Sequence, residues 1–186
     1  MIGIVLDKSK QIAALLKPSR SSAISSYLED KLINLGQKVS NISVRNLPSE
    51  NLVHANFNSP EIKRVLSLIE QARAMIFVSP VYKASYTGVL KAFIDLIPEK
   101  GLADKITLPI TTGGSIAHLL SLEYAFKPLF SILGSQEIFN GIYFVDSQTS
   151  YQDNERTFYD LDVEKRVNTA LQKIVDRLSE KNQNVQ

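Results

Sequence analysis

The stretch Ala74-Met-Ile-Phe-Val-Ser79 decides the fold class, because it is a short apolar run without polar alternation. A strand has this pattern when both of its faces are buried, as in a parallel sheet covered by helices. The run Lys105–Thr112, with Leu-Pro-Ile at its centre, has the same character. Segments with helical spacing of apolar residues lie between such runs, and this alternation predicts an α/β fold.

Working outward, two further strands are predicted at Gln37–Val44 and Ile138–Val145. The first strand has two candidates, Ile2–Leu6 and Ile12–Leu16, and we favour Ile2–Leu6 followed by a longer loop. With it, five strands alternate with five helices. This pattern predicts a flavodoxin-like fold, with a five-stranded parallel doubly wound sheet and helices on both faces.

The helices are predicted from apolar residues at helical spacing and from their caps. One begins near Ser21 or Ser22, and another begins at Pro60 after Asn58 or Ser59. Three more cover 89–97, 119–133 and 167–178. Pro128 lies inside the fourth of these helices and cannot donate a hydrogen bond to the carbonyl of Tyr124. A kink or a π-bulge is therefore expected near Tyr124, although a simple proline bend would also fit.

Length and composition indicate an ordinary globular protein. The 186 residues, of 20.8 kDa, predict a single domain over residues 1–180 and a frayed tail over 181–186. A net charge of +2 is too small to attract nucleic acid, and no apolar run is long enough to cross a membrane. With no cysteine and two histidines, the sequence predicts no metal site, and it has no targeting segment, so we expect a cytoplasmic protein.

In a doubly wound sheet, ligands bind beyond the carboxyl ends of the strands, so the loops there are the candidate site. The segment Lys17–Ser22 supplies serines, Arg20 and free backbone N–H groups at the start of a helix. A phosphate monoester would suit such a place. The alternative is that the serines only cap the helix and that Arg20 is solvated.

Two later loops suit a flat ligand. Ser79–Gly88 carries Tyr82 and Tyr86 directly after a buried strand, and Thr111–Ser115 carries a pair of glycines after the next one. Glycine lets the backbone approach a planar ring because no Cβ intervenes. The tyrosines could instead cover the core, and the glycines could form a plain turn. Together the loops describe a slot for a flat ring beside a phosphate site, which is the shape of an FMN site.

Other nucleotide-binding signals are missing, because the sequence has neither a Gly-x-Gly-x-x-Gly after a strand nor a P-loop. His118 follows the glycine pair and is conceivable as an acid. Hydride transfer to a flavin needs no strong acid, so no catalytic side chain is predicted. His54 lies in a polar loop and is expected at the surface.

Taken together, the segments of these loops resemble the NADPH-dependent FMN reductase family, and most of all its alkanesulfonate-linked members. The resemblance runs from about Pro18 to Gln148. The segments that carry it are Pro18–Ser22, Ser79–Asp95, Leu108–Leu120, Tyr124–Pro128, Gln136-Glu137 and Asp146–Gln148.

The resemblance implies an oxidoreductase that binds FMN and reduces it with NADPH. The reduced flavin would pass to a two-component monooxygenase that oxidises sulfonates for sulfur. It implies that the phosphate is held by Ser19, Arg20, Ser21 and Ser22, and that the isoalloxazine is lined by Pro80, Val81, Tyr82 and Lys83 on one side and by Thr112, Gly113, Gly114 and Ser115 on the other. Tyr124 corresponds to the family tyrosine that lies in a π-helix at a subunit interface and governs flavin release.

One segment departs from the family. The usual Gly-Ser-Pro-Arg turn after the first strand is replaced by Leu15-Leu16-Lys17-Pro18, so the phosphate site is expected to be altered. An FMN-retaining quinone or azo reductase, and a flavodoxin-like binding protein with impaired flavin binding, therefore stay open as alternatives. Phe126, Phe130 and Ile132 look exposed on their helix and predict a homodimer or homotetramer, unless they pack on the sheet.

Overall fold

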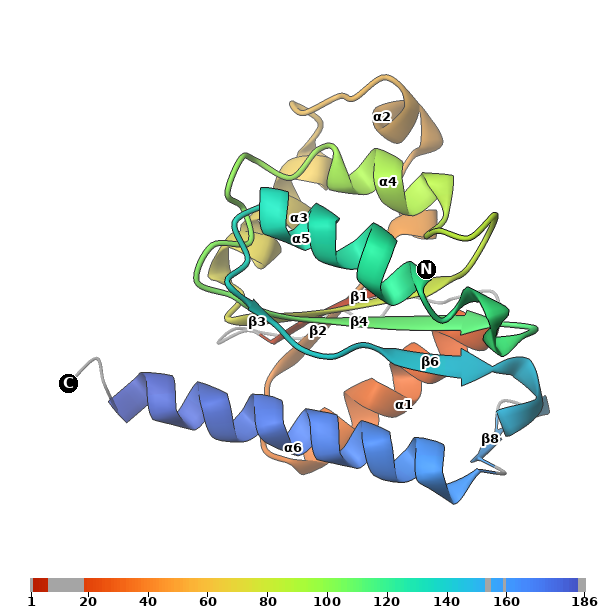
Figure 1. Ribbon diagram of the computed structural model, residues 1–186. Coiled ribbons are helices and arrows are strands. Elements are labelled where there is room, and N and C mark those ends of the chain that lie inside the picture. Colours follow the sequence, from red (N-terminus) through yellow and green to blue (C-terminus); the bar gives the residue numbers. More distant parts are fainter. Residues whose placement is uncertain (1, 7–18, 153–154, 159, 184–186) are drawn as a thin grey trace.

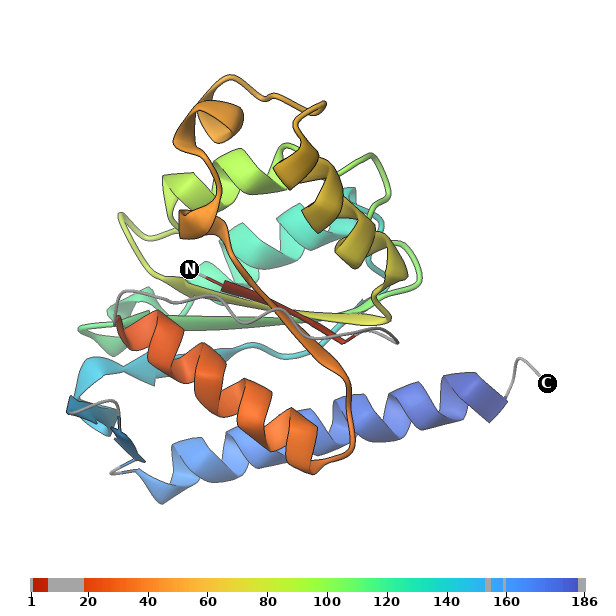
Figure 2. The same ribbon diagram turned by 180° about the vertical axis from the view of Figure 1, so that it is seen from behind.

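The computed structural model describes residues 2–6, 19–152, 155–158 and 160–183, and it has three layers (Figures 1 and 2). Helices α1 (Arg20–Asn34) and α6 (Leu161–Gln183) cover one face of the central sheet. The other face is covered by α3 (Pro60–Gln71), α4 (Gly88–Ile94) and α5 (Lys127–Ile132). The predicted α/β fold with helices on both faces is confirmed.

The centre of the sheet is the parallel pair β3 (Ala74–Pro80) and β4 (Ile106–Gly113), as the two apolar runs predict. Strand β2 (Val39–Ser43) lies at one edge, and the order is β2-β1-β3-β4. The predicted strand Ile138–Val145 is split into β5 (Glu137–Ile138) and β6 (Ile142–Val145), which both pair parallel with β4. Gly141 lies at the break, where a Cβ would be 2.6 Å from the side chain of Leu122.

The prediction of an entirely parallel sheet is wrong for one strand. Strand β1 (Ile2–Leu6) lies between β2 and β3 and is antiparallel to both, with Ile2 opposite Val78 and Leu6 opposite Ala74. Parallel direction is enforced where a strand leads through a short turn into its crossover helix. Thirteen residues separate the end of β1 from the start of α1, so the sequence carries no short turn of this kind. The alternative first strand, Ile12–Leu16, lies outside the described residues.

The two faces of β3 divide the core, as expected for a strand buried on both sides. Phe77 packs under α4 and α5, where its ring centroid lies 4.6 Å from that of Phe130. Ile76 and Val78 point to the opposite face and pack with the apolar residues of α1 and α6. Those residues include Ile24, Leu28 and Leu32 of α1 and Val167, Leu171 and Ile174 of α6.

Serine side chains start two of the helices. Ser59 accepts a hydrogen bond from the backbone N of Ile62 ahead of Pro60, as predicted for α3. For α1 the cap is Ser19, two or three residues before the predicted Ser21 or Ser22. Ser19 and Ser22 form a capping box, in which each side chain accepts from the other's backbone N–H. The helix therefore begins with Arg20.

The segment around Tyr124 contains the predicted π-bulge. Residues Leu122–Phe126 form a π-helix, η3, that continues into α5, with Pro128 in the first turn of that α-helix. The expectation that Phe126 and Phe130 are exposed is wrong, because both are fully buried, whereas Ile132 is exposed. A π-turn contains an extra residue and so rotates the residues after it about the helix axis. Phe126 consequently lies edge-on to Tyr86, with ring centroids 5.2 Å apart.

The remaining elements lie at the margins of the sheet. A short helix α2 (Ser49–Val53) follows the 3-10 turn η1 (Val44–Asn46), and strands β7 (Thr149–Gln152) and β8 (Glu155–Phe158) pair antiparallel. Helix α6 extends to Gln183, so the first residues of the predicted tail 181–186 are helical. Across the described part of the chain, we find no helix with the length and apolar character needed to span a bilayer.

The carboxylate of Glu137 anchors α6 to the edge of the sheet. It accepts from Arg177 Nε at 2.5 Å and pairs with Lys181. Partial burial alone would raise the pKa of Glu137, but the hydrogen bonds from Lys181 and Arg177 outweigh burial and lower it.

We predict that Glu137→Gln lowers the free energy of unfolding by about 1 kcal/mol at neutral pH, since a partly exposed, doubly paired carboxylate contributes on this scale. Because the pKa is lower in the folded state, this stabilisation is present above the unfolded-state pKa and lost as the pH falls through the folded-state pKa. Urea unfolding of both proteins across acidic and neutral pH measures the effect. A difference that is the same at all pH values would contradict this assignment.

Candidate functional site

A cavity of about 530 Å³ opens at the carboxyl ends of β3 and β4. This volume lies within the range of about 300–1,000 Å³ that small-molecule sites have. The lining residues come from the start of α1, from η1, from the last residues of β3 and β4 and the segments that follow them, from the first turn of α4, and from the residue after β6. They are Ser19, Arg20, Ser21, Arg45, Pro80, Val81, Tyr82, Thr87, Val89, Thr112, Gly113, Gly114 and Asp146.

The first turn of α1 forms one end of the cavity. Ser19 and Ser21 line it, and Ser21 lies in the first turn, where backbone N–H groups have no carbonyl partner within the helix. Ser22 does not line the cavity, because its hydroxyl accepts from Ser19 N at 2.8 Å and donates to Ser19 O at 2.8 Å. The hydroxyl of Ser22 is therefore used within the capping box, and Ser19, Arg20 and Ser21 are the residues of this turn that face the cavity.

Arg20 projects from this turn onto a carboxylate. Its Nη1 lies 2.6 Å from Asp146 Oδ2, and Thr112 Oγ1 donates to the other carboxylate oxygen at 3.2 Å. Asp146 is the first residue after β6, so the contact joins the start of α1 to the ends of β4 and β6. The guanidinium, the hydroxyl and the carboxylate thus form one charged cluster on the wall of the cavity.

The segment after β3 is held against β4 by the backbone. Val81 N donates to Thr112 O at 2.8 Å, and Tyr82 and Ser85 exchange two backbone hydrogen bonds around Lys83 and Ala84. Both residues of this tight turn have positive φ, 52° and 63°, without being glycine. Such a conformation is uncommon for residues with a Cβ and occurs in two-residue hairpin turns. Tyr82, which precedes this turn, lines the cavity and is 65% exposed.

The segment after β4 is positioned by Tyr143 of β6. The buried phenol donates to Ser115 O at 2.7 Å and reaches under Gly113, where an added Cβ would be 2.4 Å from Tyr143 Oη. Burial and the nearby charge of Asp146 raise the pKa of Tyr143, so the phenol stays a donor at neutral pH. Gly113 is required here for close approach, whereas a Cβ on Gly114 would meet its nearest atom only at 3.9 Å.

The cavity brings together most of the residues that the sequence predicts for flavin binding. Nine of them line it, namely Ser19, Arg20, Ser21, Pro80, Val81, Tyr82, Thr112, Gly113 and Gly114. Ser22, Lys83 and Ser115 lie outside the lining, although Ser115 is held next to it by Tyr143. Their roles in binding stay predictions.

Four lining residues were not predicted: Arg45, Thr87, Val89 and Asp146. Two sequence signals pointed to the segment of Asp146: it directly follows the predicted strand Ile138–Val145, and it shares the family resemblance. Arg45 lies in η1, directly after β2, and only the topology could place it at this rim.

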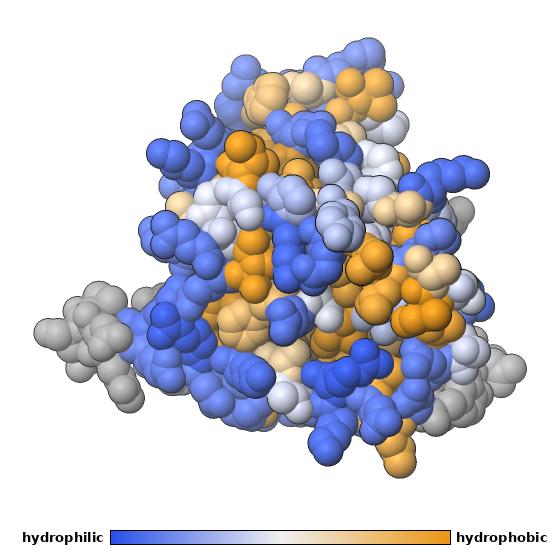
Figure 3. Space-filling model, viewed as in Figure 1, coloured by the Kyte–Doolittle hydropathy of each residue, from blue (hydrophilic) through white to orange (hydrophobic). Residues whose placement is uncertain are grey.

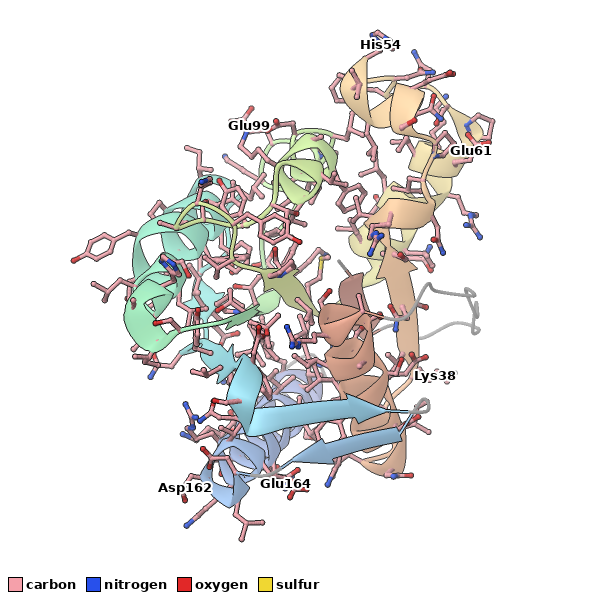
Figure 4. The ribbon with its side chains drawn as sticks, turned by 90° about the vertical axis from the view of Figure 1, so that its right-hand side faces the viewer. Lys38, His54, Glu61, Glu99, Asp162 and Glu164 are labelled. Carbon is pink, nitrogen blue, oxygen red and sulfur yellow. The ribbon has the colours of Figure 1, made fainter. Side chains whose placement is uncertain are left out.

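The histidines and Tyr124 lie elsewhere. Figure 4 looks onto the carboxyl end of the sheet and shows His54 on α2 at the far margin of the molecule. His118 is exposed in the 3-10 turn η2 (Ile116–His118) and does not line the cavity. Tyr124 is 78% exposed in the π-helix. Among the described residues, no group of three or more His, Cys, Asp or Glu side chains could hold a metal ion.

Comparison with known proteins matches this chain to one protein family. The model of the NADPH-dependent FMN reductases matches residues 12–150. A protein named FMN reductase (NADPH) from Escherichia coli K12 is 41% identical over 155 residues, which cover 83% of this chain and 81% of the relative. A protein of the same name from Pseudomonas putida KT2440 is 45% identical over 138 residues, covering 74% and 70%.

The solved structures agree with the sequence comparison. The apo form of the NADH:FMN oxidoreductase EmoB superimposes with a TM-score of 0.76 at 30% identity, covering 88% of this chain and 84% of that one. The family match begins at residue 12, after β1, so the inverted strand lies outside the part that the family model covers.

The contact between Gly113 and Tyr143 yields a double-mutant prediction. Gly113→Ala should lower the free energy of unfolding by about 1–3 kcal/mol, because the new methyl group clashes with the buried phenol oxygen. Tyr143→Phe removes that oxygen and leaves the next ring atom at 3.4 Å, so the double variant should recover part of the loss. Denaturant unfolding of the four proteins gives the coupling.

Gly114→Ala is the matched control and should change stability little, since its Cβ meets nothing closer than 3.9 Å. If the effects of Gly113→Ala and Tyr143→Phe simply add, the clash is not the cause.

Proposed function

The chain belongs to the NADPH-dependent FMN reductase family, and on this basis we propose that it transfers a hydride from NADPH to FMN. The observation that carries the proposal is the cavity, in which a helix N-terminus with Arg20 lies beside two backbone segments that follow adjacent buried strands. The first part suits a phosphate, and the second suits the edge of a planar ring.

We propose that different residues bind the phosphate and the ring of FMN. Ser19, Arg20 and Ser21 are proposed to receive the phosphate, while Pro80–Tyr82 and Thr112–Gly114 line the isoalloxazine. Bound FMN supplies the chemistry by accepting the hydride. The protein supplies orientation and keeps water from the reacting faces, and no side chain is asked to act as a strong acid or base.

The fate of the reduced flavin is part of this proposal. From the resemblance to the alkanesulfonate-linked members, we propose that the reduced flavin leaves the site and supplies a two-component monooxygenase in the cytoplasm. A related protein from Pseudomonas fluorescens Pf0-1, named NADH-dependent FMN reductase SfnF, is 42% identical over 83 residues, covering 45% of this chain and 44% of the relative.

The activity test measures NADPH oxidation with and without FMN. We expect oxidation only when FMN is present, and bleaching of the flavin when NADPH is added without oxygen. Oxidation that proceeds without flavin would overturn the proposal. A protein that purifies yellow and reduces quinones without releasing FMN would indicate the retaining quinone or azo reductase, and a failure to bind FMN would indicate the impaired binding protein.

We also propose that the exposed apolar patch after β4 packs against a second copy of the chain. The patch comprises Ile116, Leu119, Leu120 and Tyr124, and all four are at least 41% exposed. Figure 3 shows apolar residues gathered at the right of this face, over the segment that follows β4. Contiguous apolar surface of this kind marks interaction sites in soluble proteins, and it adjoins the π-helix of Tyr124.

We predict that Leu120→Asp shifts the protein from a dimer or tetramer to a smaller species, because a charge cannot be buried unpaired in an apolar interface. Light scattering after size exclusion measures the mass. Val53→Asp, at a residue 75% exposed on α2 and away from the patch, is the matched control and should leave the mass unchanged. A monomeric parent protein would refute the interface.

A further inference from the structure

The wall of the cavity contains an anion of its own. Asp146 accepts from Arg20 Nη1 at 2.6 Å and from Thr112 Oγ1 at 3.2 Å, so both carboxylate oxygens are occupied. All three residues line the cavity, together with Ser19 and Ser21 at the start of α1. A guanidinium beside a helix N-terminus is a donor that a phosphate monoester would take. In this structure, that donor is paired with a carboxylate.

The arrangement lets Asp146 oppose a bound phosphate in two ways. If the phosphate takes Nη1 of Arg20, the carboxylate must give up its shortest contact, which it makes with 28% of its side chain exposed. If Asp146 stays, the phosphate must sit beside a second negative charge, and like charges at this range repel. Either route weakens phosphate binding relative to the same cavity with a neutral side chain at position 146.

Arg45 also lines the cavity and contributes a second positive charge. Two guanidinium groups and one carboxylate line the cavity, and the carboxylate neutralises Arg20. Only one net positive charge is therefore left among the lining side chains to attract a phosphate. The carboxylate should not weaken binding of the flavin ring, because the ring carries no phosphate group.

From this geometry we propose that Asp146 is an affinity-setting residue that competes with the phosphate of the flavin for Arg20. The inference rests on the proposed function, because a reductase that hands on its flavin must hold the phosphate end weakly enough to release it. Asp146 then lowers the preference of the cavity for FMN over riboflavin, which has the same ring and no phosphate.

The test is Asp146→Asn in the full chain. Asparagine keeps the size of the side chain and can still accept from Thr112, but it removes the charge. We expect the dissociation constant for FMN, measured by quenching of flavin fluorescence, to fall by about tenfold, because Arg20 then has no charged partner to give up and the phosphate has no neighbouring negative charge. The dissociation constant for riboflavin should not change.

The matched control is Asp95→Asn. Asp95 forms an exposed ion pair with Lys91 at 2.5 Å on α4 and does not line the cavity. It changes the net charge by the same amount and should change neither dissociation constant. Weaker or unchanged FMN binding by Asp146→Asn would overturn the proposal, because it would mean that Asp146 holds Arg20 in place for the phosphate.

A second measurement separates this inference from the proposed function. Inorganic phosphate should raise the melting temperature of Asp146→Asn more than that of the parent protein, whether or not a flavin binds. If neither protein binds FMN or riboflavin, the proposed function fails while the phosphate measurement still decides the role of Asp146. If phosphate stabilises both proteins equally, the carboxylate does not compete for the site and the inference is wrong.

Discussion

The candidate site depends on the parallel register of β3 and β4. Pro80 lies opposite Thr112, and Val81 N donates to Thr112 O at 2.8 Å, so the two strands end together and their loops start side by side. Parallel strands always present their carboxyl ends at one edge of a sheet, and the buried apolar faces on both sides fix this register. The turn at Lys83 and Ala84 and the close approach of Gly113 to Tyr143 refine a geometry that the strand pair has already set.

The sequence was sufficient for the parts of the fold that rest on long apolar patterns. The runs at Ala74–Ser79 and Lys105–Thr112 predicted β3 and β4 to within about one residue. Pro128 predicted a kink or a π-bulge near Tyr124, and the structure has a π-helix there. The direction of β1 could not be predicted, because an apolar pentapeptide pairs equally well in either direction. Burial of Phe126 and Phe130 was missed for a related reason, since the π-turn changes which face of the segment meets the core.

The site was predictable to the extent that it is built from backbone. Helix starts and glycine pairs leave a sequence signal, and nine of the predicted residues line the cavity. Asp146 and Arg45 are side chains that reach the same rim from the ends of β6 and β2, near opposite edges of the sheet. No spacing in the sequence relates residues 20, 45 and 146, because only the order of the strands brings them together. Charge pairing across a rim is therefore the part of a site that sequence reading is least able to supply.

Arg20, which clusters with Thr112 and Asp146, lies just after the segment in which the sequence departs from the family. The sequence lacks the usual Gly-Ser-Pro-Arg before this helix, and in the described residues the anion-binding groups begin with the N-cap Ser19, which Arg20 follows directly. The arginine has a partner within the protein, at 2.6 Å, and is not left to solvent. If Arg20 receives the phosphate as proposed, its pairing with Asp146 lets the cavity keep the shape that fits a flavin while holding the phosphate loosely. Loose binding at that end serves the proposed release of reduced flavin, because release of the product is part of each catalytic cycle.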